Sequence, residues 1–260
     1  MVVSNADLRL SIATLVQETG EGHIPSSYSI VDILDVLYGR ILRFRLNEPR
    51  FEDRDFFILS KGHGAAALFA VMHKYGLLSG SDLAHYGRPG GILGGHPDAS
   101  KVPHVEASTG SLGHGFPSAV GISLGLRILG RGNRVFAVLG DGECHEGTIW
   151  ESAHVAANLR LDSLTAIVDW NQSASQLMPI DDLPAKWQAF GWQVSEIDGH
   201  DSAEIYETLT AQDTGGRPHA VIAHTTKGKG VSFMEGHGIW HHRIPSDAEM
   251  KLIQSELATQ

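Results

Sequence analysis

Two polar residues follow apolar runs of the sequence, at positions where their side chains could bind a metal ion. Asp141 stands between two glycines directly after the run 135–139, and Asn171 follows the run 164–170. Their oxygen atoms are the ligands that Mg²⁺ or Ca²⁺ prefers, and such ions commonly complete their shell with phosphate oxygens and water. Amides at the start of a helix after Gly142 would favour an anion there. The pattern predicts a divalent cation that holds a diphosphate.

These two residues can meet only if the two apolar runs are neighbouring strands. Short apolar runs alternate with helical segments along the chain, which predicts an α/β fold with a parallel sheet and helices on both faces. Parallel strands end at one edge, so Asp141 and Asn171 are expected to converge. Gly140-Asp141-Gly142 alone could be only a tight turn, and Asn171 favours the metal site. Strands are expected at 55–60, 135–139, 164–170, 192–197 and 219–225.

The helices are expected between these strands. The first should begin at the capping sequence SNAD, and a second should begin after Ser29, with Asp32 at its third position. Further helices are expected at 65–75, about 112–129, 147–158 and 202–211, whereas 77–110 is expected to be mostly loop. We find no break in composition, so we expect one domain over 1–260, with a tail of loop and short helix from about 231.

Composition excludes several classes of protein. The 30 acidic residues exceed the 20 basic ones, giving a net charge of −10, which argues against a general nucleic-acid surface. The one cysteine, Cys144, allows no intramolecular disulfide and fits a reducing cytoplasm. The first residues lack the basic and apolar regions of a signal peptide. No run approaches 18 uncharged apolar residues, so no membrane span is expected. The chain is rich in glycine (30) and histidine (15), often as Gly-His pairs.

Five blocks of the sequence, in order, are similar to the transketolase family. The segment GDGECHEGTIWESAHVAANLRLDSLTAIVDWN resembles the family's GDGE-x-x-EG-x-x-WEA and IVD-x-N blocks. RDFFILSKGHGAAALFA resembles RDRFILSKGHAAPALYA, GGHPD…VEASTGSLGHG resembles GHPE…VE-x-TTG-x-LGQG, and TTKGKGVSFME…WHHRIP resembles TVKGKGVSFME…WHGKAP. This resemblance implies a thiamine diphosphate-binding fold and the transfer of a two-carbon ketol unit from a ketose, with phosphorylated sugars as the expected substrates, to an aldose.

The resemblance also implies roles for particular residues. The metal would be bound by Asp141, Asn171 and the carbonyl of Ser173, and Gly142 would lie against the diphosphate. Four histidines would surround the reacting carbon and the sugar hydroxyls: His23, His63, His96 and His241. Residues near the diphosphate, the aminopyrimidine ring or the site mouth would be Ser26, Lys61, Lys227, Gly110 and Leu112. Glu146 and Glu151 would join a carboxylate network that crosses a subunit interface and links two cofactor sites.

Simpler interpretations of these residues stay open. Any one of the histidines could be a solvated loop residue, and the two glutamates could lie in water on a first helical turn. We expect His114, His145, His154 and His242 to be structural or surface residues.

Full-length relatives of this type carry a pyrimidine-binding domain and a carboxyl-terminal domain that have no counterpart in these 260 residues. We therefore expect the amino-terminal subunit of a split enzyme. Its partner would be a second chain of about 300 residues, and the assembly would be α₂β₂. Three segments depart from the family pattern: EGHIPSS, NQSASQLMPIDD and WHHRIP. They indicate an unusual sugar substrate or an adaptation to a particular partner.

Other functions remain alternatives. The chain could be the α-type subunit of a 2-oxoacid dehydrogenase, or part of a deoxyxylulose-phosphate-type synthase. It could also be a non-catalytic or regulatory subunit that retains the cofactor fold. A histidine-rich zinc protein is disfavoured because the histidines follow glycines in loops and lack regular helical spacing.

Overall fold

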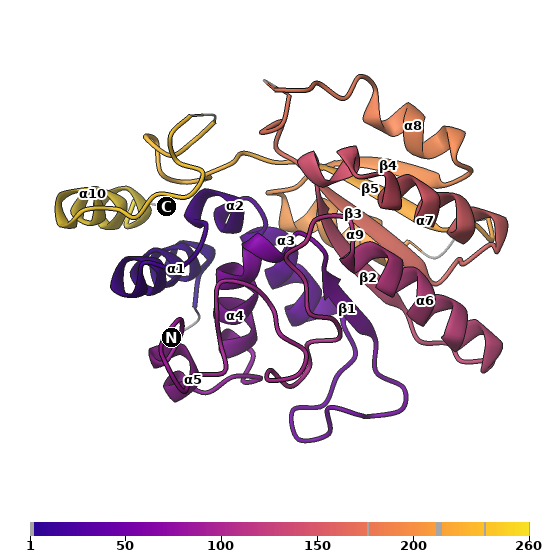
Figure 1. Cartoon of the computed structure of the whole chain (residues 1–260), viewed down its shortest axis with the longest axis horizontal. Helices are drawn as coiled ribbons and strands as arrows, with labels where there is room; N and C mark the ends of the chain where they lie inside the picture. The colour runs from indigo at the N-terminus through magenta and orange to yellow at the C-terminus, as the bar shows by residue number, and fades with distance from the viewer. Residues whose placement is uncertain (1–2, 176, 212–214, 237, 260) are drawn as a thin grey trace.

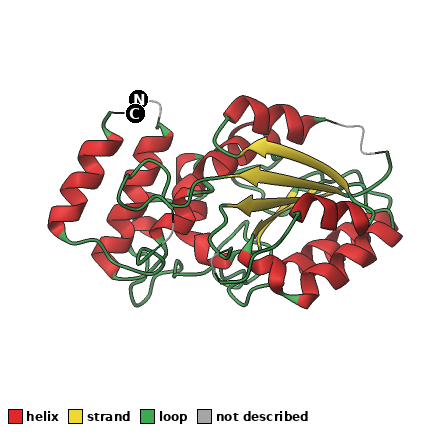
Figure 2. Cartoon of the chain, turned by 90° about the horizontal axis from the view of Figure 1, so that it is seen from above, coloured by secondary structure: helices red, strands yellow, loops and turns green. Residues whose placement is uncertain are grey.

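The computed structural model describes residues 3–175, 177–211, 215–236 and 238–259. In this part of the chain, five parallel strands form one sheet in the order β1-β2-β3-β5-β4. Their arrowheads point the same way in Figure 2. The strands are β1 (Phe56–Leu59), β2 (Val135–Gly140), β3 (Leu164–Trp170), β4 (Gln193–Asp198) and β5 (His219–His224). The predicted fold class and the expected strands are confirmed.

Helices cover both faces of the sheet (Figure 1). One face packs against α6 (Gly115–Ile128), α7 (Gly147–Asn158) and α8 (Leu183–Ala189). The other packs against α2 (Ile24–Tyr28), α3 (Val31–Val36), α4 (Ala65–Lys74) and α9 (Ser202–Thr210). The remaining elements are α1 (Asn5–Thr19), η1 (Leu37–Ile41), η2 (Gly62–Gly64), α5 (Gly80–Ala84), η3 (Gly142–His145) and α10 (Asp247–Leu257). None of the described helices combines the length and hydrophobicity needed to span a bilayer.

The apolar runs of the sequence arise because the sheet is buried on both sides. Side chains alternate between the two faces of a strand. Phe136 and Val138 of β2 therefore join the hydrophobic core beneath α3, α4 and α9, whereas Val135, Ala137 and Leu139 join the core beneath α6, α7 and α8. The whole of β2 is buried, which explains why the run that leads to Asp141 contains no polar residue.

The helix expected after Ser29 forms as α3 and η1, but it begins at Val31 and Ser29 is not its cap. The chain forms α2 before this position and α3 after it, and no side chain caps α3. Instead, the Ser29 hydroxyl donates to the buried carboxylate of Asp169 at 2.7 Å. Asp32 accepts from the guanidinium of Arg9 at 2.5 Å and lies 2.7 Å from the ring of His200. Tertiary partners have replaced the local cap at both residues. By contrast, the capping box of Ser4 and Asp7 opens α1 as expected.

Besides α2, two further short α-helices were absent from the sequence interpretation. The segment 77–110 is mostly loop, but it contains α5, whose Ser79 and Asp82 form a capping box. Helix α8 follows Asp182, which accepts from the amide of Ala185 at 3.0 Å. Both helices start with recognisable caps, but each is too short to show a clear apolar repeat.

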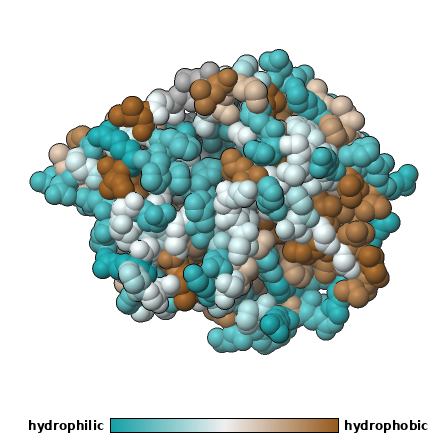
Figure 3. Space-filling view, viewed as in Figure 1, coloured by the Kyte–Doolittle hydropathy of each residue, from teal (hydrophilic) through white to brown (hydrophobic). Residues whose placement is uncertain are grey.

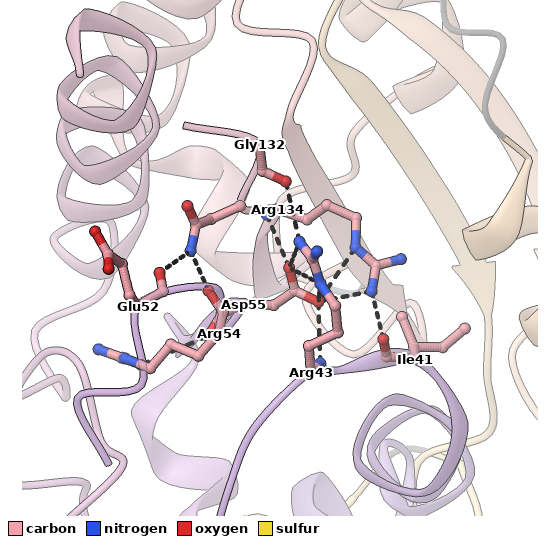
Figure 4. Close-up of polar contacts among 8 residues, drawn as sticks. Ile41, Arg43, Glu52, Arg54, Asp55, Gly132 and Arg134 are labelled. Carbon is pink, nitrogen blue, oxygen red and sulfur yellow. Dashed lines mark hydrogen bonds and ion pairs between the residues drawn. The ribbon is translucent and has the colours of Figure 1, made fainter. Parts of the chain in front are cut away.

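At the amino ends of the strands, Asp55 joins three segments of the chain (Figure 4). Its fully buried carboxylate is bound by the side chains of Arg43 (2.8 Å) and Arg134 (2.6 Å). It also accepts from the backbone amides of the same two residues, at 3.0 and 2.9 Å. The strong donor set holds the pKa of Asp55 below its usual range despite burial. This network fixes the beginnings of β1 and β2 relative to each other. It therefore supports the alignment of their carboxyl ends, where Asp141 lies.

The tail of the chain returns to its beginning. Helix α10 packs against α1, and Gln17 donates to Asp247 at 2.8 Å. Between β5 and α10, the amide of Gly228 donates to the carbonyl of Pro25 at 3.0 Å. The loop after β5 is thereby held beside α2 at the carboxyl edge of the sheet.

Candidate active site

The site begins where β2 and β3 end. These strands are neighbours, with Gly140 opposite Asp169, and the amide of Asp141 donates to the carbonyl of Asp169 at 3.2 Å. Asn171 follows one residue after the end of β3. The expected adjacency of the two strand ends is confirmed, and Asp141 and Asn171 both line the same cavity.

The side chains at this edge suit a divalent cation. One carboxylate oxygen of Asp141, Oδ1, accepts from the amide of Gly142 at 2.7 Å. The other, Oδ2, is buried and has no hydrogen-bond partner among the described residues. Burial and the neighbouring Asp169 raise the pKa of Asp141, so a bound cation would offset an electrostatic cost already present in the fold. Asn171 donates from Nδ2 to Asp169 at 2.9 Å, and its Oδ1 accepts from the amide of Ser173 at 3.0 Å and keeps a second lone pair for a ligand.

The cavity over these strand ends has a volume of about 430 Å³. Ten of the predicted site residues line it: Ser26, Lys61, His63, Leu112, Asp141, Gly142, Asn171, Ser173, Lys227 and His241. They come from several separate segments of the chain, each of which lies at the carboxyl edge of the sheet. A mixed lining of cations, oxygen ligands and apolar groups fits an anionic cofactor with an aromatic part.

A buried carboxylate that the sequence interpretation missed organises the floor of this cavity. Asp169 has a fully buried side chain and forms an ion pair with Lys61, whose side chain is only 1% exposed. It also accepts from Ser29, Asn171 and Thr225. Four donors from four segments thus converge on one carboxylate. The signal in the sequence was an aspartate inside an apolar strand, two positions before Asn171.

Four predicted histidines form a cluster beside the cavity. The ring of His23 lies 5.5 Å from that of His63, 6.2 Å from that of His96 and 5.4 Å from that of His241. Burial, reinforced by neighbouring positive groups, lowers the pKa of His23 to about 4 and that of His63 to about 2. At neutral pH the imidazoles of His23 and His63 are therefore uncharged, and each carries one donor and one acceptor nitrogen.

Lys227 and His241 form one wall of the cavity. Lys227 Nζ lies 3.2 Å from His241 Nδ1. Burial and the nearby Lys61 lower the pKa of Lys227, and burial and Lys227 lower that of His241. Because the ammonium group can only donate, Nδ1 must accept, and the proton of the neutral ring is on Nε2.

The glycine-rich loop before α6 lies against the turn after β1. Gly110 has a φ of +152°, and a Cβ there would lie 2.9 Å from the ring of His96. A Cβ at Gly62 would lie 2.7 Å from the amide nitrogen of Gly110. Both positions therefore require glycine for close backbone approach. Gly110 does not line the cavity itself, but it contacts His96 of the histidine cluster.

Glu143 is a second buried carboxylate that the sequence interpretation missed. It accepts from the Ser60 hydroxyl at 2.5 Å and from the amides of Gly113 and Gly140 at 2.8 and 3.1 Å. Burial raises its pKa. This carboxylate connects the loop before α6 to the end of β2. Its position after Gly142, within a run of acidic residues, gave no indication of which acid is buried.

The two glutamates expected at a subunit interface lie on the surface of the chain. Glu146 and Glu151 are both exposed, at the start of α7 and in its second turn. Glu146 packs against Gly113, where a Cβ would lie 2.7 Å from its own. Neither residue lines the cavity, so their network with another subunit stays a prediction.

The fold and site together define an α/β protein with a cavity lined by lysines, oxygen ligands and a histidine pair at the carboxyl edge of a parallel sheet. Residues 3–260 match the family described as the thiamine diphosphate binding domain of transketolase. The chain belongs to this family. The predicted family, the transferase class and the thiamine diphosphate-binding domain are confirmed.

Similar proteins include subunits of split enzymes. The chain is 39% identical to one subunit of the apulose-4-phosphate transketolase of Actinobacillus succinogenes, over 91% of this chain and 87% of that protein. It is 37% identical to the 6-deoxy-6-sulfo-D-fructose transketolase subunit SqwG of a Clostridium species, over 93% and 90%. The transketolase of Leishmania mexicana has a similar structure, with a TM-score of 0.89 and 26% identity. That comparison covers 99% of this chain and 42% of the larger enzyme.

These comparisons support an amino-terminal transketolase subunit. The similar proteins are themselves named as subunits of transketolases, which implies a partner chain. They do not favour a 2-oxoacid dehydrogenase, a deoxyxylulose-phosphate-type synthase or a non-catalytic subunit. Within the described residues, no group of three or more His, Cys, Asp or Glu side chains could hold a metal ion.

Proposed function

We propose that Asp141, Asn171 and the carbonyl of Ser173 bind Mg²⁺, or Ca²⁺ in its place, and that the ion and Gly142 hold the diphosphate of thiamine diphosphate. With its partner, the chain then transfers a two-carbon ketol unit from a phosphorylated ketose to an aldose. The observation that carries this proposal is the convergence of Asp141 and Asn171 on one cavity, with a buried carboxylate oxygen that lacks a partner among the described residues. The names of the similar subunits, which include a sugar phosphate and a sulfosugar, support a substrate of this class.

When held by these residues, thiamine diphosphate would supply a nucleophilic carbon and a ring that can store the electron pair of the broken C–C bond. The residues of this chain supply charge and proton transfer. Lys227 lines the diphosphate end of the cavity and fixes the tautomer of His241. His241 Nε2–H can therefore donate to a substrate oxygen, and the neutral rings of His23 and His63 each offer one hydrogen-bond donor and one acceptor to substrate oxygens.

We propose that a partner chain of about 300 residues completes the site. It would carry the pyrimidine-binding and carboxyl-terminal domains, in an α₂β₂ assembly. The side of the molecule formed by α6 and α7 carries exposed apolar residues, visible in Figure 3, that support an interface there. Among them are Ile128, Leu129 and Val155, which are 76%, 69% and 45% exposed.

A single domain over 1–260 and a cytoplasmic location remain predictions.

The test is cofactor binding by the reconstituted enzyme. The chain is produced with the companion chain that co-purifies with it, and thiamine diphosphate binding is measured by calorimetry with and without Mg²⁺. We expect uptake only with the metal, and loss of uptake in Asp141→Ala. Ketol transfer is then assayed with a panel of phosphorylated ketoses and with pyruvate as the donor for rival thiamine enzymes. Metal-independent binding, or turnover of pyruvate in place of ketoses, would refute the proposal.

A further inference from the structure

A fifth histidine lies against the cluster that the sequence interpretation identified. The exposed ring of His242 lies 4.6 Å from that of His23, tilted by 56°. Each of the three predicted partners of His23 is more distant, at 5.4 to 6.2 Å. His242 is thus the nearest of these imidazoles to His23, although the sequence interpretation placed it outside the site.

Its neighbour in the chain faces a different part of the site. His241 contacts Lys227 and lines the cavity that contains the strand ends, whereas His242 does not line that cavity. Both rings lie beside His23, but only His241 lines the cavity. The exposed ring of His242 therefore extends the histidine cluster beyond the cavity lining.

The segment that carries His242 is fixed on both sides. Before it, Trp240 is only 9% exposed and packs against Phe233 with their rings 5.3 Å apart. After it, the Arg243 guanidinium lies 4.4 Å from the Trp240 ring and pairs with Glu249 of α10 at 2.7 Å. The family pattern that this segment resembles has glycine in place of His242, so this chain adds a side chain at a defined place beside the cluster.

We propose that His242 is a substrate-binding residue that contacts hydroxyl groups of the sugar beside His23, outside the cavity at the strand ends. This inference rests on the proposed function. The chemistry fits, because an imidazole offers both a donor and an acceptor to a sugar hydroxyl. The lowered pKa values of His23, His63 and His241 leave these three rings uncharged at physiological pH, so they offer hydrogen bonds to hydroxyl groups. His242 then distinguishes sugars by their hydroxyl pattern beyond the reacting carbons.

The experiment compares His242→Gly and His242→Gln in the reconstituted enzyme. His73→Gln is the matched control, because it changes an exposed histidine near the end of α4 that does not line the cavity. We expect His242→Gly to raise the KM for the donor ketose about tenfold while kcat changes less than about threefold. His242→Gln should raise KM less, because its amide retains hydrogen-bonding groups. The dissociation constant of thiamine diphosphate with Mg²⁺ should stay within about twofold in all three variants.

Three outcomes would overturn the inference. A KM that stays within about twofold of wild type in His242→Gly would show that the ring does not contact substrate. A parallel loss of cofactor affinity would show that it supports the cofactor site. A wild-type complex that binds no thiamine diphosphate would refute the proposed function and this inference with it, and is distinguished by its failure before any His242 variant is compared.

Discussion

Asp169→Asn tests whether one buried carboxylate holds the floor of the site together. The substitution preserves the size of the side chain and removes its charge. Lys61 then keeps a buried ammonium group without its counterion, since the side chain of Lys61 is only 1% exposed. The new amide also presents a donor to a cluster of donors from Ser29, Asn171 and Thr225.

The magnitude follows from these contacts. Removal of one partner of a buried, hydrogen-bonded ion pair costs about 3–5 kcal/mol. Asparagine retains one acceptor oxygen, so part of the network survives, and we expect Asp169→Asn to lower the free energy of unfolding by about 3 kcal/mol. Typical domains unfold with about 5–15 kcal/mol, so the variant should remain folded but be clearly weakened.

Urea unfolding of the wild type, Asp169→Asn, Lys61→Met and the double variant measures this cost. Because the double variant removes both charges, its loss of stability should be at least about 1 kcal/mol smaller than the sum of the single losses. The midpoints should shift with little change in the slope of unfolding free energy against urea. A cost below about 1 kcal/mol for Asp169→Asn, or strictly additive losses, would show that the pair does not stabilise the site as argued.

Three further predictions concern other parts of the molecule. Asp55→Asn should lower the free energy of unfolding by about 2–3 kcal/mol in urea without changing Mg²⁺-dependent cofactor affinity, since the residue lies at the opposite end of the sheet; a parallel loss of affinity would contradict this. Asp141→Ala should abolish cofactor binding in calorimetry but leave the urea midpoint of unfolding unchanged or raised. The reason is that Oδ2 of Asp141 is buried without a partner among the described residues, and burial raises the pKa of this carboxyl group. A lowered midpoint would argue for a structural role. The lowered pKa of His63 means that the unfolded chain binds more protons below about pH 6.5, so stability falls as pH drops from that value. His63→Gln should lessen this fall between pH 7 and 5 in urea unfolding, and an unchanged slope would refute the assignment.

The strands could be predicted because their burial on both faces leaves an uninterrupted apolar run. The adjacency of β2 and β3 followed from the simple rule that consecutive parallel strands pair, and it placed Asp141 near Asn171. The cap of the helix after Ser29 could not be predicted in the same way. Ser29 has the residue type of a helix cap, but its hydroxyl instead donates to Asp169, which lies 140 residues further along the chain. Local propensity is overridden where a buried charge needs a donor.

The histidines could be assigned by resemblance, because each stands in a motif. His242 could not, since the motif has glycine at that position and no local pattern shows which ring it meets. Its contact with His23 depends on the path of the chain after Trp240, which is set by packing against Phe233 and by the pairing of Arg243 with Glu249. These contacts join segments whose separation in sequence gives no periodic signal.

The two strand-end aspartates show why the chemistry of a residue cannot be inferred from its type and place alone. Asp141 and Asp169 lie at the ends of neighbouring strands and both are buried. Donors from 29, 61, 171 and 225 occupy both oxygens of Asp169, whereas Asp141 retains an oxygen without a partner among the described residues. The distribution of donors among distant segments therefore makes Asp141 the better candidate for the proposed metal ligand. Asp169 has an indirect role in this proposal, because it holds the amide nitrogen of Asn171 and so leaves the oxygen of Asn171 as the acceptor atom.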